Sequence, residues 1–384
     1  MQIKPLTGIK VIDLTNYLPG PMCTRHLADM GAEVIKIEER EKGDFSRSVP
    51  PLKKINSAFF LAVNRNKYSI ALDLKQEEGK NILFKLSENA NVLVESFRPG
   101  VAKKLGIDYN VIKSKNPKII YCSITGYGQV GPYSEKAGHD LNFSSYAGIV
   151  KKDSITNFQI ADIVGGTLTA TMGILAALIQ QKTTGEGQYL DVSILDGTLA
   201  HSAVALAFEA NENDTSNLNS LTGDQPCYNI YETKDKRLIA LAAIEFKFWK
   251  SFCEAIDKKD LIQYHMTFDD NAKKIYNELS LIFKTKTLSE WLDYFKDKDC
   301  CVSPVLTIKE ALNNEHVKAR DLIINEKHPI EGDVTQFSLP IKFSSFNFNI
   351  EKPAPMLGED TEKILKGLGY SEKDIEELKE KKII

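Results

Sequence analysis

The sequence predicts an α/β protein: a large doubly wound domain with a parallel sheet, and a smaller α+β domain. Apolar runs of strand type alternate with helical stretches through residues 9–128. Turns rich in glycine and proline follow several of these runs, as expected of a doubly wound sheet. The length of 384 residues is too great for one small core, which favours two domains.

The N-terminal segment supplies the first strand–helix–strand unit. Residues 9–14 (IKVIDL) and 32–38 (AEVIKIE) are short apolar runs, and residues 22–30 between them have a helical pattern. Gly31 is placed to cap that helix. Two strands joined through a helix imply parallel pairing. The fingerprint GxGxxG is absent, so the unit does not indicate a dinucleotide site.

The alternation continues along the chain. The next elements are a strand at 68–74, a helix at 76–89, a strand at 91–97 and a strand within 116–128. In such sheets ligands bind beyond the carboxyl ends of the strands. Three turns lie at that edge: 18–21, 96–100 and 125–128. The sequence therefore predicts a Rossmann-like parallel sheet with a ligand site at its carboxyl edge.

The middle of the chain carries the domain boundaries. Residues 163–181 have a helical pattern rich in small residues, and the most apolar part is too short to span a membrane. The polar stretch NENDTSNLNS at 211–220 is typical of a loop. We expect a large domain of residues 1–200 plus 325–384, a linker of 201–226 and a small domain of 227–324.

The small domain and the C-terminal tail have their own patterns. A hairpin is expected at 228–245. The helices expected after it are 246–256, 270–284, 288–297 and a short one near 309–312. Residues 330–351 indicate irregular strand structure, and the tail indicates two amphipathic helices with Ser371 as an N-cap.

The composition is that of an ordinary globular protein, with 42% hydrophobic and 26% charged residues and a net charge of −3. This charge does not indicate a nucleic-acid partner. The six cysteines show no CxxC spacing, which favours reduced thiols. The N-terminus lacks the apolar run of a signal peptide. We expect a cytoplasmic protein without a nucleic-acid or membrane partner.

Residues 137–166 hold two groups suited to proton transfer, His139 and Asp162. Histidine as a residue type has a pKa of about 6.5. Asp162 lies among apolar residues and shortly before Gly165 and Gly166. A helix start beside glycines offers free N–H groups to an anionic intermediate. The alternatives are a structural or exposed histidine, and an aspartate that caps a helix.

Other charged residues are candidates for binding. Glu245 ends the apolar run LIALAAI and precedes an aromatic group; its alternative is an ordinary surface acid. Arg98 in SFRPG, and Asn64 with Lys67 in NRNK, are candidates for phosphate contact; their alternative is ordinary solvated polar residues. No metal-ligand spacing and no GxSxG motif is convincing.

Six blocks of the sequence together resemble the family III CoA-transferases and their isomerase relatives. The blocks are GIKVIDLTNYLPGPMCTRHLADMGAEVIKIE, NRNKYSIALDLK, VLVESFRPG, IIYCSITGYGQVGPY, TGEGQYLDVSILDG and PAPMLGEDTEKIL. Within this family AGHDLNF, ADIVGG and ALAAIEFKFW are similar to the alpha-methylacyl-CoA racemase branch. The transferase branch usually lacks the histidine of the GHD block, so His139 is the discriminating residue.

The resemblance implies roles for particular residues. His139 and Asp162 would be the two proton-transfer groups, and Glu245 would hold or tune Asp162. The residues that would lie along the CoA are Asn64, Lys67, Arg98, Gly126, Tyr127, Gly138 and Arg40. Racemases often carry a nucleotide-contacting arginine after the second strand. Here Glu39 occupies that position and Arg40 follows it.

The resemblance also implies an assembly and a substrate. It implies an interlocked homodimer, each site built from the large domain of one chain and the small domain of the other. The substrate would be an acyl-CoA, with no metal and no cofactor beyond the CoA moiety.

The leading hypothesis is a racemase that inverts the α-carbon of 2-methylacyl-CoA thioesters by 1,1-proton transfer through an enolate. The pKa of Asp162 would then have to rise by two or three units, roughly 3–4 kcal/mol, through burial and Glu245. One alternative is a CoA-transferase in which Asp162 is the nucleophile. Another is a CoA-binding protein without activity. Dependence on an acceptor acid separates the two enzymes.

Overall fold

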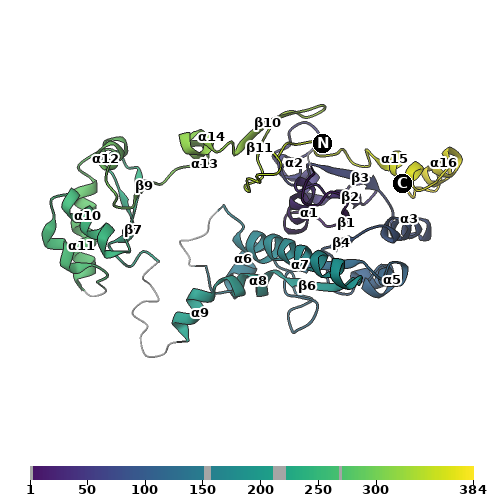
Figure 1. Cartoon of the computed structure of the whole chain (residues 1–384), viewed down its shortest axis with the longest axis horizontal. Helices are drawn as coiled ribbons and strands as arrows, with labels where there is room; N and C mark the ends of the chain where they lie inside the picture. The colour runs from purple at the N-terminus through teal and green to yellow at the C-terminus, as the bar shows by residue number, and fades with distance from the viewer. Residues whose placement is uncertain (1–2, 151–156, 211–221, 268–269) are drawn as a thin grey trace. The chain divides into compact units, whose positions relative to one another are not determined.

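The computed structural model describes residues 3–150, 157–210, 222–267 and 270–384. It divides into two compact units (Figure 1). Unit 1 comprises Met1–His201 and Asp321–Ile384, and unit 2 comprises Ser202–Arg320. The loop expected at 211–220 lies outside the described residues.

Unit 1 is built on a six-stranded sheet in the order β3-β2-β1-β4-β5-β6. Its strands are β1 (Lys10–Leu14), β2 (Glu33–Glu38), β3 (Lys67–Ala71), β4 (Val92–Glu95), β5 (Ile120–Thr125) and β6 (Tyr189–Ser193). Every neighbouring pair is parallel; in the centre, Val11 pairs with Val34 on one side and Val92 on the other. The predicted parallel α/β sheet is confirmed.

Helices cover both faces of this sheet. They are α1 (Pro19–Asp29), α2 (Ala58–Val63), α3 (Glu77–Glu88), α4 (Val101–Leu105), α5 (Tyr109–Lys115), α6 (Asp140–Tyr146), α7 (Thr169–Thr184), α8 (Ile194–His201), α15 (Thr361–Gly367) and α16 (Glu372–Glu380). A 3₁₀ turn spans Phe45–Ser48, and a π-helical segment spans Ala161–Leu168.

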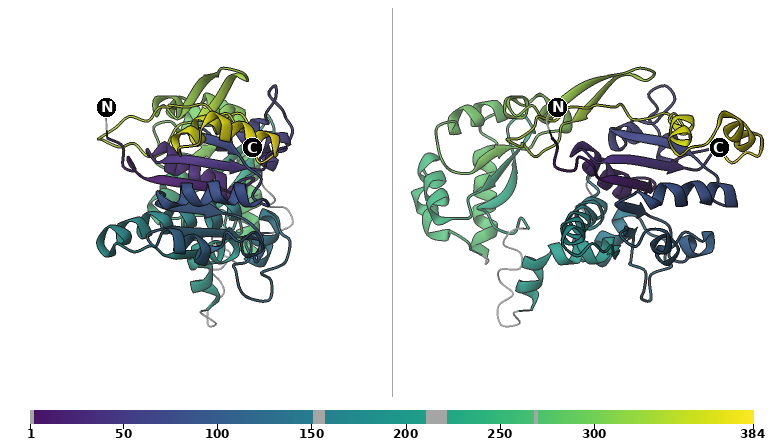
Figure 2. Two further views of the ribbon diagram at one scale, coloured as in Figure 1. Left: turned by 90° about the vertical axis from the view of Figure 1, so that its right-hand side faces the viewer. Right: turned by 45° about the vertical axis from the view of Figure 1, so that its right-hand side comes forward.

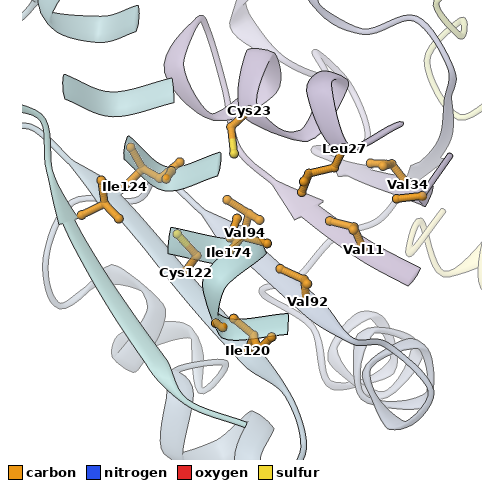
Figure 3. Close-up of a cluster of buried hydrophobic side chains, with 14 of the residues drawn as sticks. Val11, Cys23, Leu27, Val34, Val92, Val94, Ile120, Cys122, Ile124 and Ile174 are labelled. Atoms are coloured by element: carbon orange, nitrogen blue, oxygen red, sulfur yellow. The ribbon is translucent and has the colours of Figure 1, made fainter. Parts of the chain in front are cut away.

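Alternating strand residues point to opposite faces and form two cores. Val11 lies in the core beneath α1 and α7, shown in Figure 3, and the next residue, Ile12, lies in the core beneath α3, α5, α15 and α16. Cys23 of α1 and Ile174 of α7 are fully buried in the first core. Burial of both strand faces explains the continuous apolar runs in the sequence.

The π-helical segment continues directly into α7. The combined helix, Ala161–Thr184, is longer than the apolar part that the sequence indicated within 163–181. Within the described residues it is the one helix long and apolar enough to cross a membrane, judged by length and composition alone. Core helices of soluble proteins pass the same test. In this structure Ala170, Ile174 and Ala177 of the helix pack into the core of unit 1.

Two glycines let the π-helical segment lie directly against α8. A Cβ atom built on Gly165 would lie 2.2 Å from the carbonyl oxygen of Ile194, and one built on Gly197 would lie 2.4 Å from the carbonyl oxygen of Gly165. Any larger side chain would separate the two backbones. This contact fixes the segment that carries Asp162 at the end of β6.

The C-terminal segment returns to unit 1. Its antiparallel hairpin, β10 (Ile323–His328) and β11 (Gly332–Phe337), begins earlier than the strand structure expected from residue 330. The polar sequence of β10 concealed that strand. Figure 2 shows the C-terminal helices, in yellow, beside the N-terminal sheet. The predicted N-cap is confirmed, since Ser371 Oγ accepts the N–H of Asp374 at 3.2 Å.

The chain end is fastened to β3 and the residues after it. Asp360 accepts the N–H of Ser69 at 2.9 Å, and the carbonyl of Ile383 accepts the N–H of Asp73 at 2.8 Å. Leu365 and Ile383 are fully buried in the core shared with α3. The C-terminal segment is therefore part of the same hydrophobic core as the sheet.

Unit 2 is an α+β unit with a three-stranded antiparallel sheet. Its strands, in the order β7-β8-β9, are β7 (Tyr228–Glu232), β8 (Leu238–Ala242) and β9 (Val302–Pro304). Its helices are α9 (Ala203–Glu209), α10 (Phe246–Ala255), a 3₁₀ helix (Lys259–Tyr264), α11 (Asp270–Phe283), α12 (Leu288–Phe295), α13 (Ile308–Asn313) and α14 (Glu315–Ala319). Trp249, Phe252 and Trp291 fill its core. The predicted hairpin is confirmed.

The glycine contact predicts a stability difference between two Gly→Ala variants. Gly197→Ala should destabilise the protein by about 1–3 kcal/mol, because its Cβ must displace backbone. Gly173→Ala in α7 is the matched control, since its Cβ would meet Leu190 Cδ1 at an ordinary 3.7 Å. Urea unfolding measures both; equal stability of the two variants would show that the contact does not constrain the helices.

Candidate active site

A cavity of about 1600 Å³ lies at the carboxyl edge of the sheet in unit 1. Segments that follow five neighbouring strands line it: residues 16–19 after β1, 39–41 after β2, 72–75 after β3, 96–99 after β4 and 125–126 at the end of β5. Parallel strands bring these segments to one edge. The cavity therefore gathers turns that are far apart in the sequence.

His139 and Asp162 both line this cavity. His139 is the N-cap residue of α6, and its N–H donates to Asn142 Oδ1 at 3.1 Å. Asp162 lies in the first turn of the π-helical segment, whose N-cap is Ile160. Asp162 is therefore not the cap itself, and the capping alternative for it is wrong. Two groups able to exchange protons stand at the beginnings of two helices.

Asp140 is the carboxylate that the structure places beside Asp162. Asp140 Oδ1 accepts the N–H of Asp162 at 3.0 Å. Burial raises the pKa of Asp162 to about 7, and the negative charge of Asp140 adds to the shift. Asp140 was not among the residues predicted from the sequence, although it directly follows His139. Glu245 belongs to unit 2, where it is the N-cap residue of α10, and its place beside Asp162 stays a prediction.

Asn64 and Lys67 do not reach the cavity, which corrects the expectation that they contact CoA. Both side chains are fully buried. Lys67 Nζ donates to Asp13 Oδ2 at 2.9 Å, to Asn64 Oδ1 at 2.8 Å and to the carbonyl of Pro21 at 2.9 Å. Burial lowers the pKa of Lys67 to about 8, and Asp13 opposes that change. These two residues support the strands beneath the site.

Asp13 and Lys67 belong to a larger buried charge cluster with Lys36 and Asp44. Lys36 Nζ lies 2.8 Å from Asp44 Oδ2 and 3.9 Å from Asp13 Oδ2, and it donates to the carbonyl of Thr15 at 2.7 Å. Burial alone would lower the pKa of Lys36, but the two carboxylates outweigh it and raise that pKa. For Asp13 and Lys36, the available sequence signal was a charged residue inside an apolar strand run.

Four of the residues expected along the CoA do line the cavity: Arg40, Arg98, Gly126 and Gly138. A Cβ built on Gly126 or Gly138 would lie 2.5 or 2.7 Å from Phe143 Cε1, so both positions exclude a side chain. Tyr127 does not line the cavity. Its ring is buried and packs edge-on against Phe143 at 5.1 Å, so it supports the wall from behind.

Glu39 and Arg40 follow β2, and their side chains have different partners. Glu39 Oε2 accepts the N–H groups of Glu41 and Lys42 at 3.0 and 2.7 Å, so this carboxylate is hydrogen-bonded within its own loop. Among the described residues, the one ion pair of Arg40 is with the exposed Glu41, at 2.6 Å. A pair exposed to water is weak, so an anionic ligand can compete for Arg40.

Glu95 is a buried acid that directly precedes residues lining the cavity, and it was not predicted from the sequence. Its carboxylate accepts the N–H of Phe97 at 2.7 Å and the hydroxyl of Ser123. Burial raises the pKa of Glu95 to about 7. Phe97 and Arg98 line the cavity, so Glu95 holds the turn that presents them. Across the four described ranges, no group of three or more His, Cys, Asp or Glu is arranged to hold a metal ion.

The fold and the cavity define a doubly wound α/β protein with a carboxyl group of raised pKa and an imidazole at the edge of its sheet. A model of CoA-transferase family III matches residues 6–361. The chain belongs to this family of enzymes.

Relatives with different activities are equally similar to the chain. The human alpha-methylacyl-CoA racemase is 33% identical over 396 residues, covering 99% of this chain and 97% of its own. The human succinyl-CoA:glutarate CoA-transferase is 33% identical over 392 residues, covering 98% and 89%. Identity therefore does not decide between the two reactions.

Solved structures share the fold. A mutant of Rv3272 from Mycobacterium tuberculosis has a TM-score of 0.83 at 28% identity, covering 95% of this chain and 99% of its own. A CAIB/BAIF family protein from Brucella suis has a TM-score of 0.80 at 27% identity, covering 96% and 100%.

The contact between Asp140 and Asp162 predicts a titration shift. Asp140→Asn keeps an oxygen for the N–H of Asp162 but removes a negative charge, so the pKa of Asp162 should fall from about 7 toward 3.8 without reaching it, because burial remains. Carbon-13 NMR of the aspartate carboxyl groups measures this, with Asp162→Asn assigning the signal. An unchanged titration would remove Asp140 as a cause.

Proposed function

We propose that this protein is a racemase of 2-methylacyl-CoA thioesters. The carrying observation is that His139 and Asp162 line one cavity and that the pKa of Asp162 is raised to about 7. A carboxyl group with that pKa is present in both protonation states near neutral pH. A group that must both remove and return a proton needs this property.

In the proposed reaction, one of the two groups removes the proton from the α-carbon, and the C–H electron pair moves into an enolate. The other group then gives its proton to the opposite face of the same carbon. One proton enters and one leaves, so the product differs from the substrate only in configuration. The starting protonation states of His139 and Asp162 reverse with the direction of the reaction.

The enolate needs electrostatic stabilisation. The N–H groups of Asp162 and Ile163 are already donated, to Asp140 Oδ1 and to the carbonyl of Gln159. These two N–H groups are therefore not the free donors that the sequence analysis expected. The positive end of the dipole of the long helix Ala161–Thr184 remains, and it favours negative charge at its first turn.

The CoA moiety is proposed to lie toward the charged turns of the cavity. Arg40 after β2 and Arg98 after β4 both line it, and arginine suits phosphate contacts. Binding energy from this remote part positions the thioester. The proposal needs no metal and no cofactor beyond the CoA moiety.

CoA transfer is the second candidate, because the human succinyl-CoA:glutarate CoA-transferase is as similar as the racemase. In that reaction the carboxylate of Asp162 attacks the thioester carbonyl and releases CoA thiolate, leaving a mixed anhydride. The thiolate attacks the aspartyl carbonyl, which releases the first acid, and an acceptor carboxylate repeats the sequence in reverse. It needs Asp162 ionised when its carboxylate attacks the thioester, and it gives His139 no task.

The proposed roles of His139 and Asp162 predict that each variant loses proton exchange for a different configuration of the substrate. His139→Ala should abolish exchange of the α-proton for one configuration of a 2-methylacyl-CoA, and Asp162→Asn for the other, while racemisation falls at least about 100-fold in each. Proton NMR in D₂O, without an acceptor acid, measures exchange and racemisation separately for each configuration.

Asp333→Asn is the control, because Asp333 is exposed on β11 and does not line the cavity. Near-normal racemisation by either catalytic variant would remove that residue from the mechanism. If the wild-type protein exchanges no proton but moves CoA to an added carboxylic acid, the transferase proposal replaces the racemase proposal.

We further propose an interlocked homodimer in which Glu245 of one chain serves Asp162 of the other. The family resemblance supports it, and so do exposed apolar side chains such as Met172, Val204 and Leu206, which an interface would cover. The proposal places the carboxylate of Glu245 beside the proton-transfer pair.

The dimer proposal predicts complementation between inactive chains. Asp162→Asn and Glu245→Gln homodimers should each be impaired. A mixed dimer would hold one intact site and one doubly altered site, so it should recover about half of wild-type activity. Co-expression with two different affinity tags gives the mixed dimer. Absence of recovery would place Glu245 within its own chain's site, and a monomer by light scattering would end the proposal.

A further inference from the structure

Two aromatic side chains, Tyr17 and Phe45, lie stacked inside the cavity. Their ring centroids are 5.5 Å apart with an angle of 27° between the planes. Both residues line the cavity, yet they remain 44% and 54% exposed. Aromatic rings carry a large apolar surface, and exposed apolar surface inside a cavity marks a place for an apolar ligand group.

Tyr17 of this pair has a strained backbone conformation that hydrogen bonds hold in place. Tyr17 has a φ of 64°, in the left-handed region that residues other than glycine rarely adopt. Its N–H donates to Asp44 Oδ1 at 3.1 Å, and the same oxygen accepts the N–H of Ser46 at 2.8 Å. One buried carboxylate therefore fastens the segments on both sides of the ring pair. Strain that is held in this way often marks a functional position.

The segment that bears Tyr17 reaches the helix that carries Asp162. Two residues after Tyr17, the carbonyl of Pro19 accepts the hydroxyl of Thr167 at 2.9 Å. A Cβ built on Gly166 would lie 2.9 Å from Pro19 Cβ. Thr167 and Gly166 belong to the π-helical segment that carries Asp162. The segment that bears Tyr17 thus packs directly against the helix of the catalytic carboxyl group.

Two cations in the segments on either side of Phe45, Lys36 and Arg47, are already engaged. Lys36 Nζ is bound to Asp44 at 2.8 Å, and the Arg47 guanidinium is bound to Glu38 at 2.7 Å. A carboxylate placed against the two rings would lose water without gaining either partner, which is unfavourable. An apolar group would instead bury its surface against both rings.

We propose that Tyr17 and Phe45 form the surface that binds the acyl group and that they select bulky apolar acyl groups, branched or ring-bearing, over short or carboxylate-bearing ones. The inference rests on the proposed acyl-CoA substrate. It applies equally to proton transfer and to CoA transfer, because both reactions place the acyl group beside Asp162.

The test compares variants across a set of thioesters. Tyr17→Gly removes the ring and relieves the positive φ, so the fold is retained; Phe45→Ala removes the second ring. Tyr17→Phe keeps the ring, and Ile55→Ala removes an exposed apolar side chain that does not line the cavity. The ligands are 2-phenylpropionyl-CoA, 2-methylbutyryl-CoA, methylsuccinyl-CoA and free CoA.

Tyr17→Gly and Phe45→Ala should each raise the Kd of 2-phenylpropionyl-CoA by about tenfold or more and lower its kcat/KM by a similar factor. The losses for methylbutyryl-CoA and methylsuccinyl-CoA should be smaller. The Kd of free CoA should not change, and Ile55→Ala should resemble the wild type. Tyr17→Phe should keep the preference among the thioesters, because it keeps the ring. Calorimetry measures binding even if neither proposed reaction occurs, so a failure of the proposed function does not obscure this result.

Three outcomes would overturn the inference. An equal loss of affinity for free CoA would show that the rings hold the nucleotide. An equal loss for all three thioesters would show that the rings do not select among acyl groups. Unchanged binding of 2-phenylpropionyl-CoA by both ring variants would show that the acyl group does not touch them.

Discussion

The cavity depends on four charges buried beneath it: Asp13, Lys36, Asp44 and Lys67. Charges removed from water are tolerated only when they are paired and hydrogen-bonded, and here each cation lies against at least one carboxylate. Their bonds reach from β1, β2 and β3 to the backbone that surrounds the site. Loss of any one would leave a neighbour uncompensated, so the strands and turns on this side of the sheet are held together as a set.

The part of the cavity that holds His139 and Asp162 is formed by the first turns of two helices. Asp140 connects the start of α6 with the start of the π-helical segment, and this places a negative charge beside the partly buried Asp162. Burial and a like charge act in the same direction on that carboxyl group. The family contains both racemases and CoA-transferases, and a carboxyl group at this place is usable by either chemistry. The proposed proton transfer uses the raised pKa of this carboxyl group.

The sequence was informative where structure follows local pattern. The alternation of apolar runs with helical stretches predicted the sheet, and Ser371 was predicted as a cap because capping depends only on nearby residues. Lys67 was misassigned because a lysine in a polar turn has the same pattern whether it binds a ligand or an internal carboxylate. Its partner Asp13 is 54 positions away in the sequence, and only the folded sheet brings them together. The stacking of Tyr17 on Phe45 was likewise hidden, since it depends on the paths of two separate turns.

The return of the C-terminal segment to unit 1 has a consequence for the order of events during synthesis. Unit 2 is continuous in sequence, so its core residues have all been translated before residues 321–384 are made. Unit 1 is different, because Leu365 and Ile383 complete the core on one face of its sheet. On the ribosome, the inserted unit can fold while the surrounding one still exposes apolar surface. One face of the sheet that carries the cavity can thus be completed only after unit 2 has been translated.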